Sequence, residues 1–444
     1  MDNKNLFVWI LTLFQTTLFF AQVKLPSPHD YYTPMNMGTF MPKIPTLDIY
    51  RTDEKQHINQ QNERLMREDM LREKRQKETL RQIGEDIIEF RNVDYNLPLF
   101  SNENSAEFYS NVFDKMLTLN VENYSIKDVN FQIENAYFEN KLDQEEFERA
   151  IKQTGEFLIA KMKESNYDLN SNVAKNFMLF EFFTQTLQVK GFKEKHFPLK
   201  YDFEDYRGNE QWSKMFVSKL LKTGKGQCHS MPLLYLILAE EIGAEAYLSL
   251  SPNHSYIKFQ DEKEKWHNIE LTNGMFTVSS FILNSGFIKA EAIQNHIYMK
   301  NLSKQELLSQ FYVDLSMGYI HKYGHDQFVE KVTNKALELY PNSIGANMIL
   351  SNLYTIRFEN ATKKIGINPR DNKELQKIKY YPQVINWLDQ TNNQYAKIDA
   401  LGYQAMPDEA YENWLNSLKE TKNKQDNENF KKQFKGLSIK KTKE

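Results

Sequence analysis

The pattern of apolar and polar positions in the first half of the chain is that of helices. In several segments apolar side chains recur every three or four residues, which is typical of helices with one buried face. These segments are Ala106 to Leu119, Gln144 to Lys163 and Ser171 to Val189. Asp143 stands where it can cap the second of them. We therefore expect residues 51–200 to form a mainly helical N-terminal region.

A long charged segment opens this region. From Arg51 to about Phe90 the residues are mostly Glu, Lys, Arg and Gln, with apolar residues scattered among them. This pattern predicts a charged, partly amphipathic helix whose charges form a solvated face. Residues 22–50 contain five prolines and have neither a helical nor a strand period. We expect them to form an extended, proline-rich arm.

Residues 201–300 combine one helix with three strands. An apolar run that ends at Gly243 predicts the helix, and Pro232 is tolerated only in its first turn, so the helix must begin close to Cys228. Alternating patterns predict the strands, at Ala244 to Ser251, His254 to Phe259 and Trp266 to Leu271. Together with the flanking helices, this region predicts an α+β fold.

The last two strands bring an imidazole and a carboxylate close together. Alternation places His254 on one face of its strand and Glu270 on one face of the next. A five-residue loop, Gln260 to Glu264, puts the two side chains directly opposite each other, with their Cβ atoms about 4.5 to 5.5 Å apart. Cys228 lies at a helix N-terminus, where the helix dipole favours the thiolate. A thiol, an imidazole and an orienting acid are the groups that nucleophilic catalysis needs.

Three motifs in this region resemble those of the transglutaminase-like superfamily. They are Gly-Gln-Cys at 226–228, His254-Ser-Tyr and Glu270-Leu-Thr-Asn-Gly. The resemblance implies a papain-like core with Cys228 as nucleophile, His254 as general base and then acid, and Glu270 as the orienting acid. It also implies that the amide of Cys228 helps to bind the oxyanion. The sequence departs from the family in two places, because Glu270 replaces the usual Asp and Leu271 the usual proline.

The C-terminal part of the chain is again helical in its pattern. The segment Lys335 to Asn342 resembles a tetratricopeptide repeat, in which small residues let two helices pack closely and a proline starts the next pair. A second helical pair, Pro382 to Leu401 and Asp408 to Lys419, continues the stack in this interpretation. We expect residues 301–420 to form a TPR-like helical region, with an ordinary helical bundle as the alternative. The charged tail, 421–444, is expected to be disordered.

Other polar residues have simpler interpretations. His229 follows the cysteine and is expected at the surface or in support of the site, and His267 faces away from the site. His321 and His325 have the spacing of a helical metal pair, but no acid completes a zinc pattern. Trp212 either lines the cleft or packs in the core. We therefore expect neither a metal nor a cofactor.

The first residues have the form of a signal peptide. Leu6 to Phe20 is uncharged and mostly apolar, and Ala21 is a small residue at a plausible cleavage point. A signal anchor is the alternative. Cleavage after residues 1–21 predicts a periplasmic or secreted bacterial protein. No later stretch approaches the ~20 apolar residues that span a bilayer, so no integral membrane segment is expected after cleavage.

Composition narrows the possible functions further. With 56 basic and 59 acidic residues and a net charge of -3, the chain has no electrostatic basis for binding nucleic acid. Its single cysteine excludes an intramolecular disulfide. We expect an exported thiol enzyme that acts on amide bonds of a protein or peptide, by hydrolysis or acyl transfer. The alternatives are a catalytically inactive scaffold that binds a protein partner through TPR-like helices, and a structural component of the cell envelope.

Overall fold

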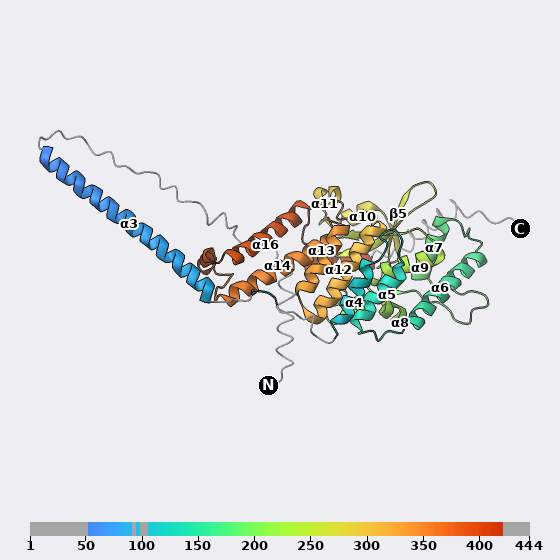
Figure 1. Ribbon diagram of the computed structural model, residues 1–444. Helices are drawn as coiled ribbons and strands as arrows, with labels where there is room; N and C mark the ends of the chain where they lie inside the picture. The colour runs from blue at the N-terminus through green and yellow to red at the C-terminus, as the bar shows by residue number, and fades with distance from the viewer. Residues whose placement is uncertain (1–51, 91–94, 98–104, 421–444) are drawn as a thin grey trace. The chain divides into compact units, whose positions relative to one another are not determined.

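The computed structural model describes residues 52–90, 95–97 and 105–420 and has an α+β fold (Figure 1). The chain divides into two compact units, and in the described part the first contains residues 105–353 and 393–420. The second contains residues 52–90, 95–97 and 354–392. The expected signal peptide, proline-rich arm and charged tail lie outside the described residues.

The first unit contains a sheet with helices on both sides of it in the sequence. The helices before the sheet are α4 (Glu107–Leu117), α5 (Ile126–Tyr137), α6 (Gln144–Glu164), α7 (Asn172–Thr184), the 3-10 helix η1 (Trp212–Met215), α8 (Val217–Thr223) and α9 (Ser230–Ile242). Those after it are α10 (Ser279–Leu283), α11 (Ala290–Gln294), α12 (Lys304–Tyr323), α13 (Gln327–Leu339), the first part of α14 (Ile344–Lys364), the last part of α16 (Pro382–Ala400) and α17 (Asp408–Glu420).

Local signals set most of the expected helix ends. Asp143 caps α6 by accepting a hydrogen bond from the amide of Glu146, at 3.0 Å. Gly243 ends α9 in the left-handed conformation, with φ of 66°. Helix α7 ends earlier than expected, at Thr184, because Leu187 pairs with His196 in an isolated antiparallel bridge.

The sheet is an antiparallel meander in the order β3-β4-β5-β6. Its strands are β3 (Tyr247–Ser251), β4 (His254–Gln260), β5 (Trp266–Glu270) and β6 (Met275–Thr277). A separate parallel pair joins β1 (Lys200–Tyr201) to β2 (Lys225–Gly226), directly before the cysteine. The three expected strands are therefore present in the expected order.

The register between β4 and β5 differs from the expected one by two residues. Gln260 pairs with Trp266, so the turn runs from residue 261 to residue 265, one position later than the sequence suggested. The cause is Asp261, whose side chain accepts hydrogen bonds from the amides of Lys263 and Lys265, both at 2.9 Å. His254 and Glu270 are consequently on the same face but not directly opposite each other.

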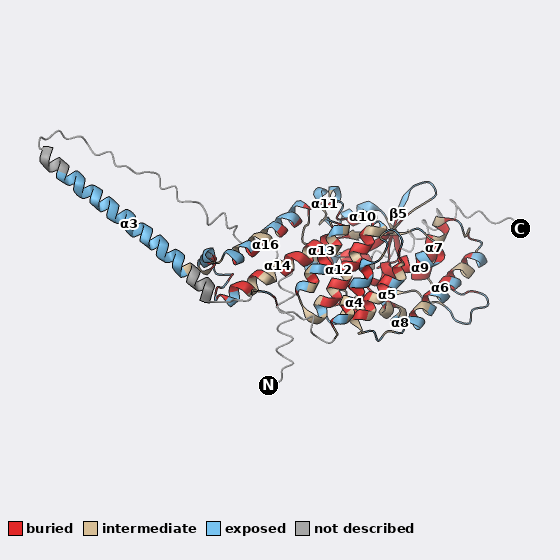
Figure 2. Cartoon of the chain, in the orientation of Figure 1, coloured by how far each residue is buried: buried red, intermediate tan, exposed pale blue. Residues whose placement is uncertain are grey.

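The main core of the first unit surrounds α9, where Figure 2 shows buried residues gathered. One buried cluster joins Ile151 of α6, Ile257 of β4, Leu315 of α12 and Leu418 of α17 to the apolar residues of α9. The expected boundaries at residues 200 and 300 thus fall inside a shared core. The reason is that α6, α7 and α8 pack against α9, while α12 packs against α4 and α5.

Helices α12 and α13 pack closely as an antiparallel pair. Gln305 near the start of α12 donates a hydrogen bond to the carbonyl of Leu339 at the end of α13, at 2.7 Å. Small residues lie between the helices, and Ser309 Oγ donates to the carbonyl of Ala336, also at 2.7 Å. The TPR-like character of residues 301–420 stays a prediction.

The expected second helical pair does not share a buried cluster. Ile398 of α16 is buried with Ala292 and Ile297, whereas Tyr411 and Leu418 of α17 belong to the main core. Because their apolar faces are buried in different clusters, α16 and α17 do not continue a stack as one pair.

The second unit contains α3 (Thr52–Phe90), the remainder of α14 and α16, α15 (Asn372–Leu375) and the 3-10 helix η2 (Gln376–Tyr380). Helix α3 is the charged helix expected from the sequence, and its described side chains are almost all exposed (Figure 2). Phe358, Trp387 and Leu388 belong to a small core of this unit. Throughout the described residues, no helix combines the length and the apolar character that crossing a bilayer requires.

Candidate thiol site

Cys228 lies two residues before the start of α9, as its position ahead of Pro232 predicted. Helix α9 begins at Ser230, so Pro232 occupies its first turn. The cysteine is partly buried, and its carbonyl accepts a hydrogen bond from the hydroxyl of Ser255 on β4. The only thiol of the chain is therefore held between a helix N-terminus and the start of β4.

The glycine of the Gly-Gln-Cys motif is required by close packing. A Cβ atom on Gly226 would lie 2.8 Å from Ser230 Oγ and 3.0 Å from Leu220 Cδ1. The next residue, Gln227, donates its amide to Ser230 Oγ at 2.9 Å and its side chain to the carbonyl of Asp205 at 2.8 Å. These contacts fix the backbone that carries Cys228.

His254 and Glu270 form a buried hydrogen-bonded pair. His254 Nε2 lies 2.7 Å from Glu270 Oε2, and the two side chains are 1% and 3% exposed. The other carboxylate oxygen accepts the amide of Thr272 at 2.9 Å. The register places Glu270 diagonally to His254, and a diagonal pair is farther apart than a directly opposed one. The side chain of Glu is longer than that of Asp and spans this distance. The carboxylate can thus fix the tautomer of the imidazole.

The other ring nitrogen of His254 is left for the thiol. His254 Nδ1 is buried and makes no hydrogen bond of ordinary geometry in the described part of the chain. Burial alone would raise the pKa of Cys228, but the nearby imidazole of His254 and its positive charge outweigh this effect, and the pKa is lowered. Burial alone would lower the pKa of His254, but the charge of Glu270 raises it. The arrangement favours a thiolate beside an imidazolium.

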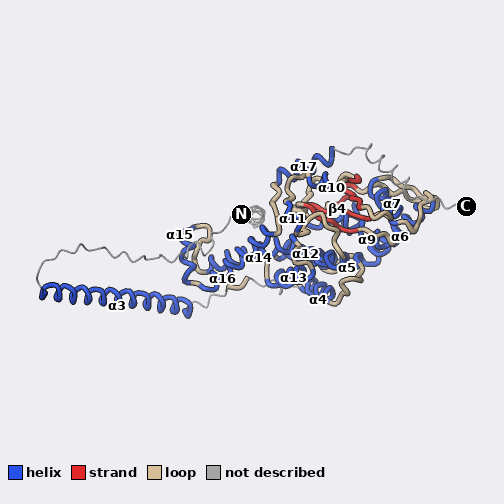
Figure 3. The backbone as a smooth tube through the Cα atoms, turned by 90° about the horizontal axis from the view of Figure 1, so that it is seen from above, coloured by secondary structure: helices blue, strands red, loops and turns tan. Residues whose placement is uncertain are grey.

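Helix α17 completes the site from a distant part of the sequence (Figure 3). Tyr411 Oη lies 4.0 Å from Cys228 Sγ, and the ring of Trp414 meets the imidazole of His254 edge-on, with centroids 4.9 Å apart. Asp408 at the start of the helix forms an ion pair with Arg207. The side chains around the thiol therefore come from both ends of the first unit.

Sequence reasoning missed this contribution of α17. The residues Tyr411, Trp414, Leu415 and Leu418 have the i, i+3, i+4, i+7 spacing of a buried helix face. That pattern predicts burial but does not say which surface the helix covers. The same holds for Tyr201, a buried residue of β1 whose sequence context contains no chemical motif.

Three other described histidines are not part of the Cys228, His254 and Glu270 arrangement. His229 Nε2 is 3.4 Å from Asp314 Oδ2, and although burial opposes it, the charge of Asp314 raises the pKa of His229. His267 bonds to Asp261 at 2.8 Å, away from the thiol as expected. Trp212 stacks on His321 instead of lining the site, with ring centroids 4.0 Å apart. Among the residues that the structure describes, no group of three His, Cys, Asp or Glu side chains is arranged to hold a metal.

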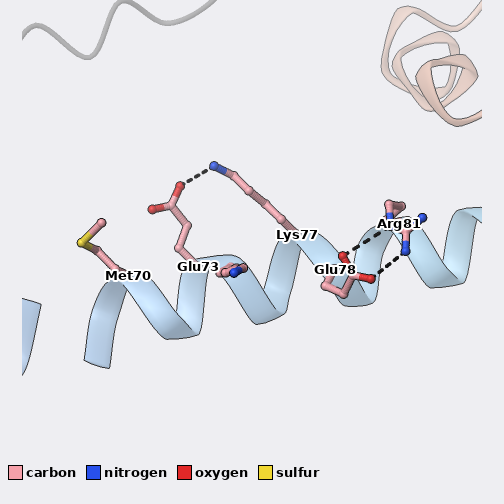
Figure 4. Close-up of a pocket in the computed structure, with 6 residues that line it drawn as sticks. Met70, Glu73, Lys77, Glu78 and Arg81 are labelled. Carbon is pink, nitrogen blue, oxygen red and sulfur yellow. Dashed lines mark hydrogen bonds and ion pairs between the residues drawn. The ribbon is translucent and has the colours of Figure 1, made fainter. Parts of the chain in front are cut away.

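A shallow hollow on α3 has no comparable chemistry (Figure 4). Its polar side chains pair along the helix, Lys77 with Glu73 and Arg81 with Glu78, each at 2.7 Å. Met70 also lines it. The hollow offers neither a nucleophile nor an imidazole, so the thiol site is the candidate functional site.

Comparisons with known proteins assign no family to the chain. No family model matches it, and no curated protein matches it in sequence. Among solved structures it is similar to a crystal structure of menin, described as revealing the binding site for the Mixed Lineage Leukemia protein. The identity is 10%, the match covers 78% of this chain and 94% of that one, and the TM-score is 0.31. At this TM-score the likeness carries no conclusion on fold or function.

Proposed function

We propose that this chain is an exported transglutaminase-like thiol enzyme that acts on amide bonds of a protein or peptide. The observation that carries the proposal is the buried bond between His254 Nε2 and Glu270 Oε2, which leaves Nδ1 for the thiol of Cys228. A cysteine before a helix, a histidine at the start of a strand and an acid at the end of the next strand also support a papain-like core.

The reaction follows from the positions of these three groups. The thiolate of Cys228 attacks the carbonyl carbon, a bond from sulfur to carbon forms, and the carbonyl electron pair moves to oxygen. His254 then gives its proton to the leaving amine as the carbon-nitrogen bond breaks. Water or a second amine, deprotonated by His254, attacks the acyl-enzyme and releases the thiolate. Glu270 holds the imidazole and stabilises its positive charge.

Hydrolysis and acyl transfer share this acyl-enzyme and differ only in whether water or an amine reaches it. The alternative function is a catalytically inactive scaffold that binds a protein partner through TPR-like helices, here the α12 and α13 pair. An inactive scaffold does not need an activated thiol. The lowered pKa of Cys228 and the orientation of His254 therefore favour the enzyme.

The pH dependence of iodoacetamide alkylation of folded protein tests this proposal. We expect wild-type Cys228 to react with an apparent pKa well below the ~8.5 of a free thiol. His254→Ala is expected to raise that pKa and slow the labelling at neutral pH. His267→Ala is the matched control, because this histidine is also bonded to a carboxylate but lies away from the thiol. Labelling that appears only after unfolding, or that ignores His254, would leave the scaffold as the function.

The export part of the proposal rests on residues 1–21. We expect the mature chain recovered from a bacterial periplasm to begin after Ala21, which intact mass spectrometry measures directly. A mass that retains these residues would contradict cleavage and favour the signal anchor.

A further inference from the structure

Two tyrosine hydroxyls lie beside the thiol and have no role in the triad. Tyr411 on α17 is 1% exposed, and its Oη is 4.0 Å from Cys228 Sγ. Tyr201 on β1 pairs in the parallel ladder with Gly226, two residues before the cysteine. Both side chains are buried in the same core as α9. In addition to burial, Cys228 raises the pKa of both phenols, so the two hydroxyls lie near the thiol and come from two separate elements.

The hydroxyl of Tyr201 lies close to Cys228 and Tyr411, and in addition to burial both groups raise its pKa. Its Oη is buried and makes no hydrogen bond of ordinary geometry with the described residues. A buried polar group without a partner is destabilising, so an acceptor that arrives with a substrate would satisfy it. Burial raises the pKa of Tyr201 and of Tyr411 well above the ordinary value, and the charge of Cys228 raises both further. Both phenols are consequently protonated at neutral pH and can donate.

The packing of α17 fixes the position of Tyr411. Leu415 and Leu418 of the same helix are buried in the main core. Tyr206 donates a hydrogen bond to Glu412 at 2.9 Å, and its ring lies 5.4 Å from that of Tyr411. A donor held in place before the reaction needs no reorganisation when charge develops.

We propose that the hydroxyls of Tyr201 and Tyr411 form the oxyanion site of the thiol enzyme, an inference that rests on the proposed function of Cys228. In the tetrahedral intermediate the negative oxygen is bonded to the carbon that is itself bonded to sulfur. A hydroxyl 4.0 Å from that sulfur is close enough to approach this oxygen at the roughly 2.7 to 3.1 Å of an oxyanion donor. The resemblance to the transglutaminase-like superfamily implies the amide of Cys228 for this role.

Two reagents separate oxyanion binding from thiol activation. With p-nitrophenyl acetate, the thiolate attacks the acetyl carbon, the carbonyl electron pair moves to oxygen, and the intermediate collapses as p-nitrophenolate leaves with its bonding pair. With iodoacetamide, the thiolate displaces iodide from a saturated carbon, and no oxyanion forms. Removal of an oxyanion donor therefore affects only the first reaction.

The experiment compares both rates in wild type, Tyr411→Phe, Tyr201→Phe and the double variant, at a pH above the apparent pKa of the thiol. Loss of one donor is expected to slow acylation by about 10²-fold, with alkylation nearly unchanged. Tyr206→Phe is the control, because it removes a hydrogen bond to Glu412 of α17 but leaves the hydroxyls near the sulfur in place. Circular dichroism confirms folding, and because the tyrosines belong to different elements, each variant tests the inference independently.

Several outcomes would overturn the inference. Equal losses with both reagents would mean that the hydroxyls only position or ionise the thiol. Faster reaction with both reagents would mean that they block it. Acylation unchanged in all Phe variants, with alkylation still dependent on His254, would overturn the oxyanion site and leave the proposed function intact. Wild-type alkylation that ignores His254 would instead overturn the proposed function itself.

Discussion

The two halves of the thiol site are encoded in different ways. Cys228, His254 and Glu270 lie within one continuous helix-and-sheet segment, and the hydrogen bond between the last two spans neighbouring strands. Tyr201 precedes this segment, and Tyr411 follows it by more than a hundred residues. The positions of the thiol and the imidazole therefore depend on local geometry. The groups proposed to bind the oxyanion depend on how the rest of the unit packs around it.

This difference has a consequence for changes in sequence. Substitutions in the helix-and-sheet segment act on the thiol directly, through the orientation of His254 or the backbone at Cys228. Substitutions in α17 act through a helix that Asp408 and the buried Leu418 hold against the core. The chemistry of the two halves can therefore be lost separately.

The largest expected effect is at Glu270. Glu270→Gln keeps the size of the side chain and removes its charge, and we expect acylation by p-nitrophenyl acetate to fall by about 10²- to 10⁴-fold. Glu270→Asp keeps the charge but shortens the side chain. Because the register places residue 270 diagonally to His254, we expect Asp to restore little of the rate. Full activity of the Asp variant would show that the strand register does not require a side chain as long as Glu at position 270.

The sequence was sufficient to predict the local half of the site. Pro232 required the helix to begin near Cys228, and alternation put His254 and Glu270 on the same face. The register was wrong by two residues because the Asp261 side chain moves the turn, and strand periodicity cannot detect such a shift. The two-residue error preserves the face, so the predicted pairing of the two side chains was still confirmed.

The distant half could not be predicted for a physical reason. The apolar face of α17 predicts that Tyr411 and Leu418 are buried, as they are. The hydrophobic effect is non-directional, so the pattern does not say against which part of the protein the helix packs. The same limit explains why the boundaries at residues 200 and 300 were placed inside a shared core. Only the folded chain brings Tyr411 to Cys228.

A second prediction tests the rigidity of the local half. Gly226→Ala forces a methyl group against Ser230 Oγ and Leu220, and we expect it to destabilise the first unit by about 1 to 3 kcal/mol. The displaced backbone should also slow alkylation of Cys228. Gly84→Ala on α3 is the matched control, because nothing lies within 4 Å of its added Cβ. We expect this change to favour its helix by about 0.5 to 1 kcal/mol and to leave the thiol unaffected. Urea unfolding followed by circular dichroism measures both, and equal effects would contradict the packing argument.

The smallest expected effect compares two ion pairs of the same length. His254 with Glu270 and Lys77 with Glu73 both have 2.7 Å contacts, but the first is buried and the second exposed. Water and salt screen the exposed pair, so Lys77→Met should leave the unfolding midpoint unchanged from acid to neutral pH.

The buried pair should give stability a defined pH dependence. Burial opposes ionisation of Glu270, but the charge of His254 lowers its pKa below 4.5 in the folded protein. The stability that the Glu270 carboxylate contributes is therefore fully present above pH 4.5 and is lost as the pH falls through the folded-state pKa. Burial also opposes ionisation of His254, but the charge of Glu270 raises its pKa above 6.5. The stability that the imidazolium contributes is therefore fully present below pH 6.5 and is lost as the pH rises through the folded-state pKa. Stability from the pair is therefore greatest between about 4.5 and 6.5. In a Cys228→Ala background, which removes the titration of the thiol, Glu270→Gln should flatten this maximum, and a maximum that persists would mean that other groups produce it.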